Sequence, residues 1–167
     1  MSVLSIIEFP DSRLRIKASP VTRFDSELDQ LVHNMYQTMY SAQGVGLAAT
    51  QVNVPQQVLV IDMSENRSEA LTLVNARIAQ REGTQVYKEG CLSFPGMYAQ
   101  VTRALKVKVE ACDTRGKSFV YQAEGPLAVA IQHEMDHLEG KVFIDYLSPL
   151  KRAMLLKRME KQRKASA

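Results

Sequence analysis

The segment Ile131–Gly140, with the sequence IQHEMDHLEG, combines two histidines and a glutamate in a spacing suited to metal chemistry. His133 and His137 are four positions apart, so in a helix both project from one face, with Cβ atoms about 6 Å apart. Glu134 follows the first histidine, completing the pattern H-E-x-x-H, and can reach a water molecule on an ion that the pair holds. A catalytic metal usually takes three protein ligands and leaves a fourth position for water. The sequence therefore predicts a metal site that needs a third ligand.

The alternative interpretation is two ordinary helix histidines beside a surface glutamate. The preceding turn, 127–131, is apolar nearly all round, which is typical of a buried helix. Two histidines on such a helix need polar partners, and a metal ion supplies one for each. The remaining histidine, His33, has polar neighbours in Asn34 and Gln37 and is expected at the surface.

The third ligand is sought first among the acidic residues downstream, as in familiar H-E-x-x-H peptidases. Glu139 follows His137 by only two positions and points off another face of the helix. Asp145 is conceivable, but nothing around it marks it out. Upstream, Cys91 lies in the stretch EGCLSFPG, which reads as a loop closed by proline and glycine. We expect Cys91 to be the ligand.

The two cysteines of the chain differ in their surroundings. Gly90 precedes Cys91 and allows the backbone to approach a metal closely, and a bound thiol is deprotonated. Cys112 follows Ala111 on an expected strand and points to the face opposite that residue. A small free core cysteine explains Cys112 well.

The stretch GVGLAATQ, residues 44–51, superficially resembles a phosphate loop. It lacks a lysine and follows a helix instead of a strand, so that interpretation is weak. Its glycines allow a strand of backbone to lie beside a peptide-like ligand. Gln51 can donate an amide N–H to an oxyanion.

The whole chain has 167 residues, enough for one domain with a hydrophobic core. No apolar run approaches the roughly 20 residues of a membrane span, and the N-terminus lacks the pattern of a signal peptide. A cytoplasmic protein with reduced thiols is expected. Residues 151–167 carry seven basic residues and one acid, a net charge of +6, so the other 150 residues sum to −3.

The pattern of apolar residues predicts an α+β fold. Antiparallel β-sheets should pack around a central helix that carries the H-E-x-x-H, with one further helix near each end of the chain. We expect 1–147 to form the catalytic domain and 148–167 a basic helical extension of it. The expected elements are a helix capped by Asp25 and ending near Gln43, strands at 58–61 and 71–74, a hairpin over 106–124, a helix from Pro126 to Glu139 terminated by Gly140, and a last helix from Ser148-Pro149.

Taken together and in order, GVGLAATQ, EGCLS and QHEMDHLEG resemble the three motifs of peptide deformylases, and the resemblance covers essentially the whole chain. It looks like the bacterial type with a C-terminal helical extension. The resemblance implies removal of the formyl group from the N-terminal formylmethionine of nascent polypeptides. It implies Cys91, His133 and His137 as ligands of Fe²⁺, for which Ni²⁺, Co²⁺ or Zn²⁺ can substitute.

The same resemblance assigns further roles. Glu134 resembles the general acid/base, while Gln51 and the backbone N–H of Leu92 resemble the pair that stabilises the oxyanion. The remaining substrate-binding residues that it implies are Gly44, Val45, Gly46, Glu89, Gly90, Pro126, Val129 and Ala130.

Two other functions stay open on the residues alone. One is an ordinary H-E-x-x-H metallopeptidase, and the other is a structural metal protein whose basic helix binds nucleic acid. A structural site would have four protein ligands, whereas only three are found. We expect no DNA or membrane partner.

The basic tail has two faces in a helix. Leu155, Leu156 and Met159 project to one side. Lys157, Lys161 and Lys164 project to the other. The simpler interpretation is a basic helix end that faces only solvent. We expect instead that residues 149–167 dock on the ribosome through phosphate contacts, which weaken steeply with salt.

Overall fold

The fold is known from a computed structural model, which describes residues 2–166. Its helices, 3-10 turns and strands follow one another as η1 (Ser12–Arg15), α1 (Ser26–Ser41), β1 (Gly46–Ala48), η2 (Ala49–Val52), β2 (Val58–Ile61), β3 (Leu71–Glu82), β4 (Gln85–Cys91), β5 (Phe94–Arg103), β6 (Lys106–Cys112), β7 (Ser118–Glu124), α2 (Pro126–Leu138), η3 (Phe143–Tyr146) and α3 (Pro149–Ser166).

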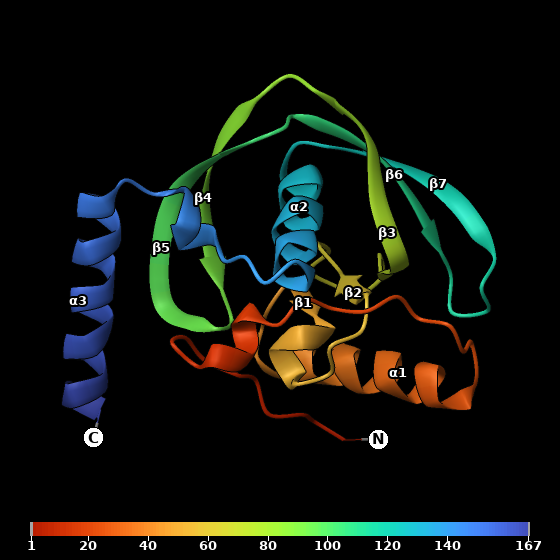
Figure 1. Cartoon of the computed structure of the whole chain (residues 1–167), viewed down its shortest axis with the longest axis horizontal. Coiled ribbons are helices and arrows are strands. Elements are labelled where there is room, and N and C mark those ends of the chain that lie inside the picture. The colour runs from red at the N-terminus through yellow and green to blue at the C-terminus, as the bar shows by residue number, and fades with distance from the viewer. Residues whose placement is uncertain (1, 167) are drawn as a thin grey trace.

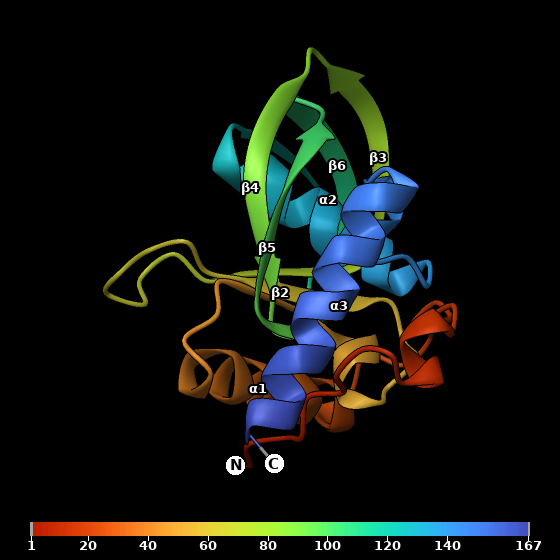
Figure 2. The same ribbon diagram turned by 90° about the vertical axis from the view of Figure 1, so that its left-hand side faces the viewer.

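Two antiparallel sheets surround one helix. The larger sheet has the strand order β1-β2-β3-β6-β7, and β4 pairs with β5 in a separate ribbon. Figure 1 shows α2 at the centre, with the β4–β5 ribbon on one side and β3, β6 and β7 on the other. Helix α1 lies beneath β1 and β2, and α3 runs along the outside of β5, as Figure 2 shows from the side. The predicted α+β architecture around a central helix is confirmed.

Most predicted boundaries agree with the structure. The side chain of Asp25 accepts hydrogen bonds from the N–H groups of Glu27 and Leu28 and so caps α1. This helix ends at Ser41, two residues before the predicted Gln43. The hairpin of β6 and β7 has the expected alternation, and its inward row includes Val109.

The sequence interpretation missed much of the strand structure between residues 75 and 103. Strand β3 continues to Glu82, and Cys91 is the last residue of β4 instead of lying in a loop. The far half of β3 is mostly exposed, and its pairing with β6 is interrupted by two register shifts. An apolar alternation marks only strands with one face in the core, so these segments carry little sequence signal.

The buried apolar residues form three clusters, one of which includes α2. Ala128, Ile131 and Leu138 belong to a cluster with the larger sheet. A second cluster joins α1 to β1 and β2. A third cluster joins β5 and η3 to α3, which contributes Leu155 and Met159. The C-terminal helix therefore completes a core of the molecule.

One smaller expectation is also confirmed. His33 is exposed on α1. Across residues 2–166, no helix has the length and apolar character needed to cross a membrane.

Candidate metal centre

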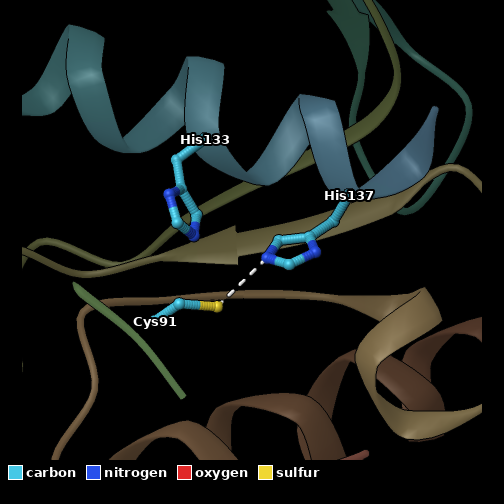
Figure 3. Close-up of side chains that lie close together, drawn as sticks. All are labelled: Cys91, His133 and His137. Carbon is cyan, nitrogen blue, oxygen red and sulfur yellow. Dashed lines mark hydrogen bonds between the residues drawn. The ribbon is translucent and has the colours of Figure 1, made fainter. Parts of the chain in front are cut away.

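The three predicted ligands come together between the two sheets. Cys91 lies at the end of β4, and His133 and His137 lie on the face of α2 that is turned toward it (Figure 3). Their ligand atoms are all within 4.8 Å of one another, and the Cys91 Sγ is 3.3 Å from the His137 Nε2. One ion can therefore contact all three side chains.

The other acids and the second cysteine are engaged elsewhere. Asp145 accepts two hydrogen bonds from Arg15, at 2.7 and 3.0 Å, and Glu139 pairs with Lys17 at 3.4 Å. Cys112 lies at the end of β6, with its Sγ 3.9 Å from the Ser118 Oγ. Half-buried, it packs against the cluster formed with α1.

The ends of α2 follow from its sequence. Gly125, at φ 66°, precedes the helix, and Pro126 occupies its first turn, where a missing N–H costs nothing. At the other end Gly140 has φ 75°, and a Cβ there would lie 2.6 Å from the carbonyl oxygen of Arg15. Glycine is thus required both for the turn and for the close approach of η1.

A carboxylate behind the first histidine fixes its orientation. The Glu89 Oε1 is 2.8 Å from the His133 Nδ1, so this nitrogen donates to the carboxylate and Nε2 is left to face the ion. Arg103 donates two hydrogen bonds to Glu89, at 2.8 and 2.9 Å. Burial raises the pKa of Glu89, but the bonds from Arg103 and His133 outweigh it and hold the pKa below its usual value. Glu89 therefore stays ionised beside the histidine.

The same arginine reaches the surface through a second carboxylate. Arg103 donates to Asp136 at 2.6 Å, and the Tyr146 hydroxyl donates to the same oxygen at 2.7 Å. The Tyr146 ring lies 4.7 Å from the guanidinium carbon of Arg103. The sequence interpretation missed Arg103, because it lies outside the three motifs and only strand pairing brings it to α2.

The second histidine presents its Nε2 to Cys91, so its other ring nitrogen is turned away from the ion position. The His137 Nδ1 is buried and has no hydrogen-bond partner within residues 2–166, and the same holds for the Glu134 Oε1. Each such atom costs about 1–3 kcal/mol when left unsatisfied. Burial, with the charges of His133 and Arg103, lowers the pKa of His137 well below its usual value, which favours the neutral imidazole that a metal needs. One thiolate and two imidazoles form a donor set that fits Zn²⁺ or another borderline transition metal.

Glu134 lies inside the site, packed against the first motif. The residue is 5% exposed, and burial raises the pKa of its carboxyl to about 7. A Cβ built at Gly46 would lie 2.6 Å from the Glu134 Oε2, so only glycine allows this approach. A Cβ built at Gly44 would likewise lie 2.6 Å from the Cδ1 of Leu92.

Gln51 joins the first motif to the second. Its Oε1 accepts the Ala48 N–H at 2.9 Å, which fixes the direction of the amide. Its Nε2 donates to the Ser93 Oγ at 3.0 Å and lies 3.6 Å from the Cys91 Sγ. The three motifs therefore meet at one point.

A cavity of about 680 Å³ opens in front of the ligands. Of the residues predicted to bind substrate or to stabilise the oxyanion, six line it: Gly44, Val45, Gly46, Gly90, Gln51 and Leu92. Lining residues that the sequence interpretation missed include Ile6, Glu8, Tyr87, Lys88, Met97 and Tyr98. Most of them lie on the unpredicted β4 and β5, where no local pattern pointed to the site.

Four other predicted substrate-binding residues lie outside this lining. Glu89 is turned toward His133 and Arg103, as described above. Pro126 begins α2, and Val129 and Ala130 are buried on the turn before His133, at 3% and 9% exposure. Their contact with the substrate stays a prediction.

Gly90 also has a packing role that the sequence interpretation did not foresee. A Cβ at this position would lie 2.5 Å from the Cε1 of Tyr98, so glycine makes room for that ring. The close packing is against a side chain of β5, and it requires no metal to explain it.

Three protein ligands, a buried carboxylate beside them and an open cavity define the class of metal-dependent hydrolases. The family model described as Polypeptide deformylase matches residues 3–153. The chain belongs to the peptide deformylase family.

Relatives support this assignment over the full length. Peptide deformylase of Xylella fastidiosa (strain M12) is 52% identical over 170 residues, covering 100% of both chains. The crystal structure of a peptide deformylase from Legionella pneumophila has a TM-score of 0.94 and 45% identity, covering 98% of this chain and 97% of that one. The peptide deformylase from Ehrlichia chaffeensis in complex with actinonin has a TM-score of 0.92 and 37% identity, covering 97% and 98%.

The predicted class of activity is confirmed by these comparisons. The protein is a metal-dependent hydrolase that deformylates peptides, and an ordinary metallopeptidase is not favoured.

Proposed function

We propose that this enzyme hydrolyses the N-formyl group of formylmethionine at the start of nascent polypeptides in the cytoplasm and releases formate. The observation that carries the proposal is the convergence of the three motifs. Cys91, His133 and His137 lie within 4.8 Å of one another, with Glu134 packed beside them on Gly46.

The metal that we propose is Fe²⁺, with Ni²⁺, Co²⁺ or Zn²⁺ able to replace it. Cys91, His133 and His137 would hold it. When bound, such an ion polarises the formyl carbonyl and lowers the pKa of water toward neutrality. The His137 Nε2 beside the Cys91 Sγ, and the Glu89–His133 bond that leaves the His133 Nε2 free, support this set of ligands.

Glu134 is the proposed general acid/base. Its Oε1 has no hydrogen-bond partner in the described chain and is free to take a proton from the attacking water. Burial raises the pKa of this carboxyl in the metal-free protein, and in the proposal the same carboxyl returns the proton to the leaving amine. Proton transfer of this kind contributes roughly 10²–10⁴ in rate.

The oxyanion is stabilised by two donors in the proposal. Gln51 presents its Nε2 beside Cys91, and Leu92 contributes its backbone N–H one residue further on. Each donor of this type is worth about 2.7–4 kcal/mol in the transition state. The Ala48 N–H holds the Gln51 amide in the required direction before the substrate arrives.

The substrate is proposed to lie in the cavity of 680 Å³. The formyl group fits beside Gly44–Gly46, where no side chain other than that of Val45 projects. The proposed methionine pocket combines Val45 and Gly90 with Glu89, Pro126, Val129 and Ala130, of which the last three lie on α2 ahead of His133.

Formate release from formyl-Met-Ala-Ser by anaerobically purified protein, with metal analysis of the same sample, tests this function. We expect stoichiometric metal and rapid formate release, and much slower hydrolysis of acetyl-Met-Ala-Ser. Cleavage of an internal amide bond without formate release, or equal kcat/KM for the two peptides, would contradict the proposal.

Ribosome docking through α3 is also proposed. Lys157 and Lys161 are exposed on the face opposite the buried Leu155 and Met159. The available charge is smaller than the net +6 implies. Arg152 and Arg163 donate to backbone carbonyls, and Lys164 pairs with Glu160 at 3.4 Å.

Since α3 completes a core, the test of docking uses substitutions and leaves the helix in place. Lys157→Gln/Lys161→Gln is compared with the wild type in ribosome co-sedimentation at low and high salt. We expect weaker binding at low salt and a shallower dependence on salt concentration. If the variant co-sedimented with ribosomes as well as the wild type, the face with Lys157 and Lys161 would be excluded as the ribosome-binding surface.

A further inference from the structure

A second cavity, of about 660 Å³, lies beside α2 and shares no lining residue with the cavity that contains the metal ligands. Helix α2 contributes Gln132, Met135, Asp136 and Glu139 to its lining, at the spacing i, i+3, i+4, i+7 of one helix face. None of these four side chains is a metal ligand, an oxyanion donor or the proposed acid/base. A volume of this size is ordinary for a small-molecule site, so the cavity can hold a ligand of its own.

The floor of this second cavity is apolar. Leu138 is a buried member of the cluster that joins α2 to the larger sheet, and Ile78, Ala104 and Met135 are half-buried at the edge of that cluster. Their apolar surface is open to the cavity. Ligand sites commonly combine an apolar lining of this kind with a few charged groups that fix the orientation of the ligand.

An irregularity in β3 turns an arginine toward this apolar floor. Ile78 is the cross-strand partner of the core residue Val109, and opposite residues in a sheet share a face. Arg81 is the partner of Val107, a second core residue on that inner face. Residues three apart on a regular strand point to opposite faces, but a register shift between Ile78 and Gln80 removes the alternation here. Arg81 therefore lines the cavity from the inner face of the sheet, although its side chain is exposed.

Two of the four cations that line the second cavity have no acidic partner. Arg77 pairs with a glutamate of β6 at 2.6 Å, and the buried Arg103 is held by two carboxylates, as described above. Arg81 and Lys141 form no ion pair within residues 2–166, and both are exposed. These two side chains are therefore available to bind an anion.

The acidic residues of the same lining do not cancel this charge. Asp136 is bonded to Arg103, and Glu139 pairs with Lys17 at 3.4 Å. Glu82 follows Arg81 on β3, so it lies on the outer face of the sheet, where Lys106 is its cross-strand partner. The free charge on the inner side of the cavity is therefore positive.

We propose that the second cavity is a ligand site that binds a small carboxylate with an apolar chain. The guanidinium of Arg81 matches the two oxygens of a carboxylate, and Lys141 adds a second positive charge. The apolar chain lies on the floor that includes Met135 and Leu138. This inference goes beyond the proposed function, because the second cavity shares no lining residue with the one in front of the metal ligands.

The test is a titration of octanoate into the isotope-labelled, Zn²⁺-loaded full chain, followed by the NMR shifts of backbone amides. We expect saturable shifts at Ile78, Arg81 and Met135. Propionate should bind at least about tenfold more weakly, because it lacks most of the apolar chain. Octylamine should also bind more weakly than octanoate, because it has the same chain and the opposite charge. Shifts confined to Gly44 and Gly46 would place octanoate in the metal-site cavity and overturn the inference.

Arg81→Gln should weaken octanoate binding about two- to fivefold, since one ion pair is lost. Arg115→Gln is the matched control, because this exposed arginine lies between β6 and β7 and lines neither cavity, so octanoate affinity should stay at the wild-type value. Tm is measured for both variants. Equal octanoate affinity of the two variants, or tighter binding of octylamine than of octanoate, overturns the inference. Formate release by Arg81→Gln should stay at the wild-type level, and its loss would assign Arg81 to the deformylation reaction instead of a separate site.

Discussion

The central helix α2 and the C-terminal helix α3 both carry residues with proposed functional roles, but they differ in how many of their residues are buried. Nine residues of α2 are buried, including His133, Glu134 and His137, whereas α3 buries only Leu155 and Met159. His133 and Asp136 of α2 bond to side chains from other elements, whereas the polar side chains of α3 mostly face solvent. Burial strengthens electrostatic effects, so each polar change on α2 should be felt more strongly than one on α3.

The largest effect is expected for the buried carboxylate of α2. Glu134→Gln keeps the shape of the side chain but cannot move a proton, so kcat should fall by roughly 10²–10⁴. Metal content should equal that of the wild type, because Glu134 is outside the ligand set. A steady-state formate assay with metal analysis measures both. Activity within about tenfold of wild type would exclude this role.

The same carboxyl should make the stability of the metal-free protein depend on pH. Burial raises the pKa of Glu134 from 4.5 to about 7, so the folded state favours the protonated form. Its contribution is therefore complete below pH 4.5 and is lost as pH rises through 7. The loss is on the order of 3 kcal/mol. In thermal unfolding of the metal-free forms between these pH values, Glu134→Gln should show a flatter profile, and identical profiles would contradict the assignment.

A smaller effect is expected behind the first histidine. Glu89→Gln replaces the carboxylate that accepts from the His133 Nδ1, so metal affinity should weaken by about 10–100-fold. Competition with a chelator measures the affinity. Glu139→Gln is the matched control, since that acid pairs with an exposed lysine. Equal affinity of the two variants would show that the Glu89 contact does not orient the ligand.

The smallest effect is expected on the exposed face of α3. Lys157→Gln and Lys161→Gln remove charges that have no buried partner, so the free energy of unfolding should change by no more than about 0.5 kcal/mol. Formate release from free peptides should stay at the wild-type level. If denaturant unfolding showed that either substitution lowers the free energy of unfolding by more than about 1 kcal/mol, these lysines would contribute to stability despite their exposure.

The metal ligands were predictable because their signal is local. A period of four within a helix places His133 and His137 together, and an apolar preceding turn marks the helix as buried. Cys91 was found by its contrast with Cys112 and with the acids downstream. The residue order alone carries this information.

Other parts of the site depend on pairing between distant strands, which no local pattern encodes. Arg103 reaches Glu89 because β4 and β5 pair in one register. Tyr98 lies over Gly90 for the same reason, so the packing of that ring on the glycine could not be foreseen. The basic residues of α3 were counted correctly, but the sequence did not show that Arg152 and Arg163 are already bound to carbonyls.

The placement of Cys91 on one sheet and the histidines against the other has a consequence for the order of assembly. The thiol belongs to the small ribbon, and about 40 residues of chain separate it from His133, so an ion bound by all three closes a long loop. The ligands meet only after the ribbon has folded against α2. An ion held by all three side chains would therefore tie the ribbon of β4 and β5 to helix α2.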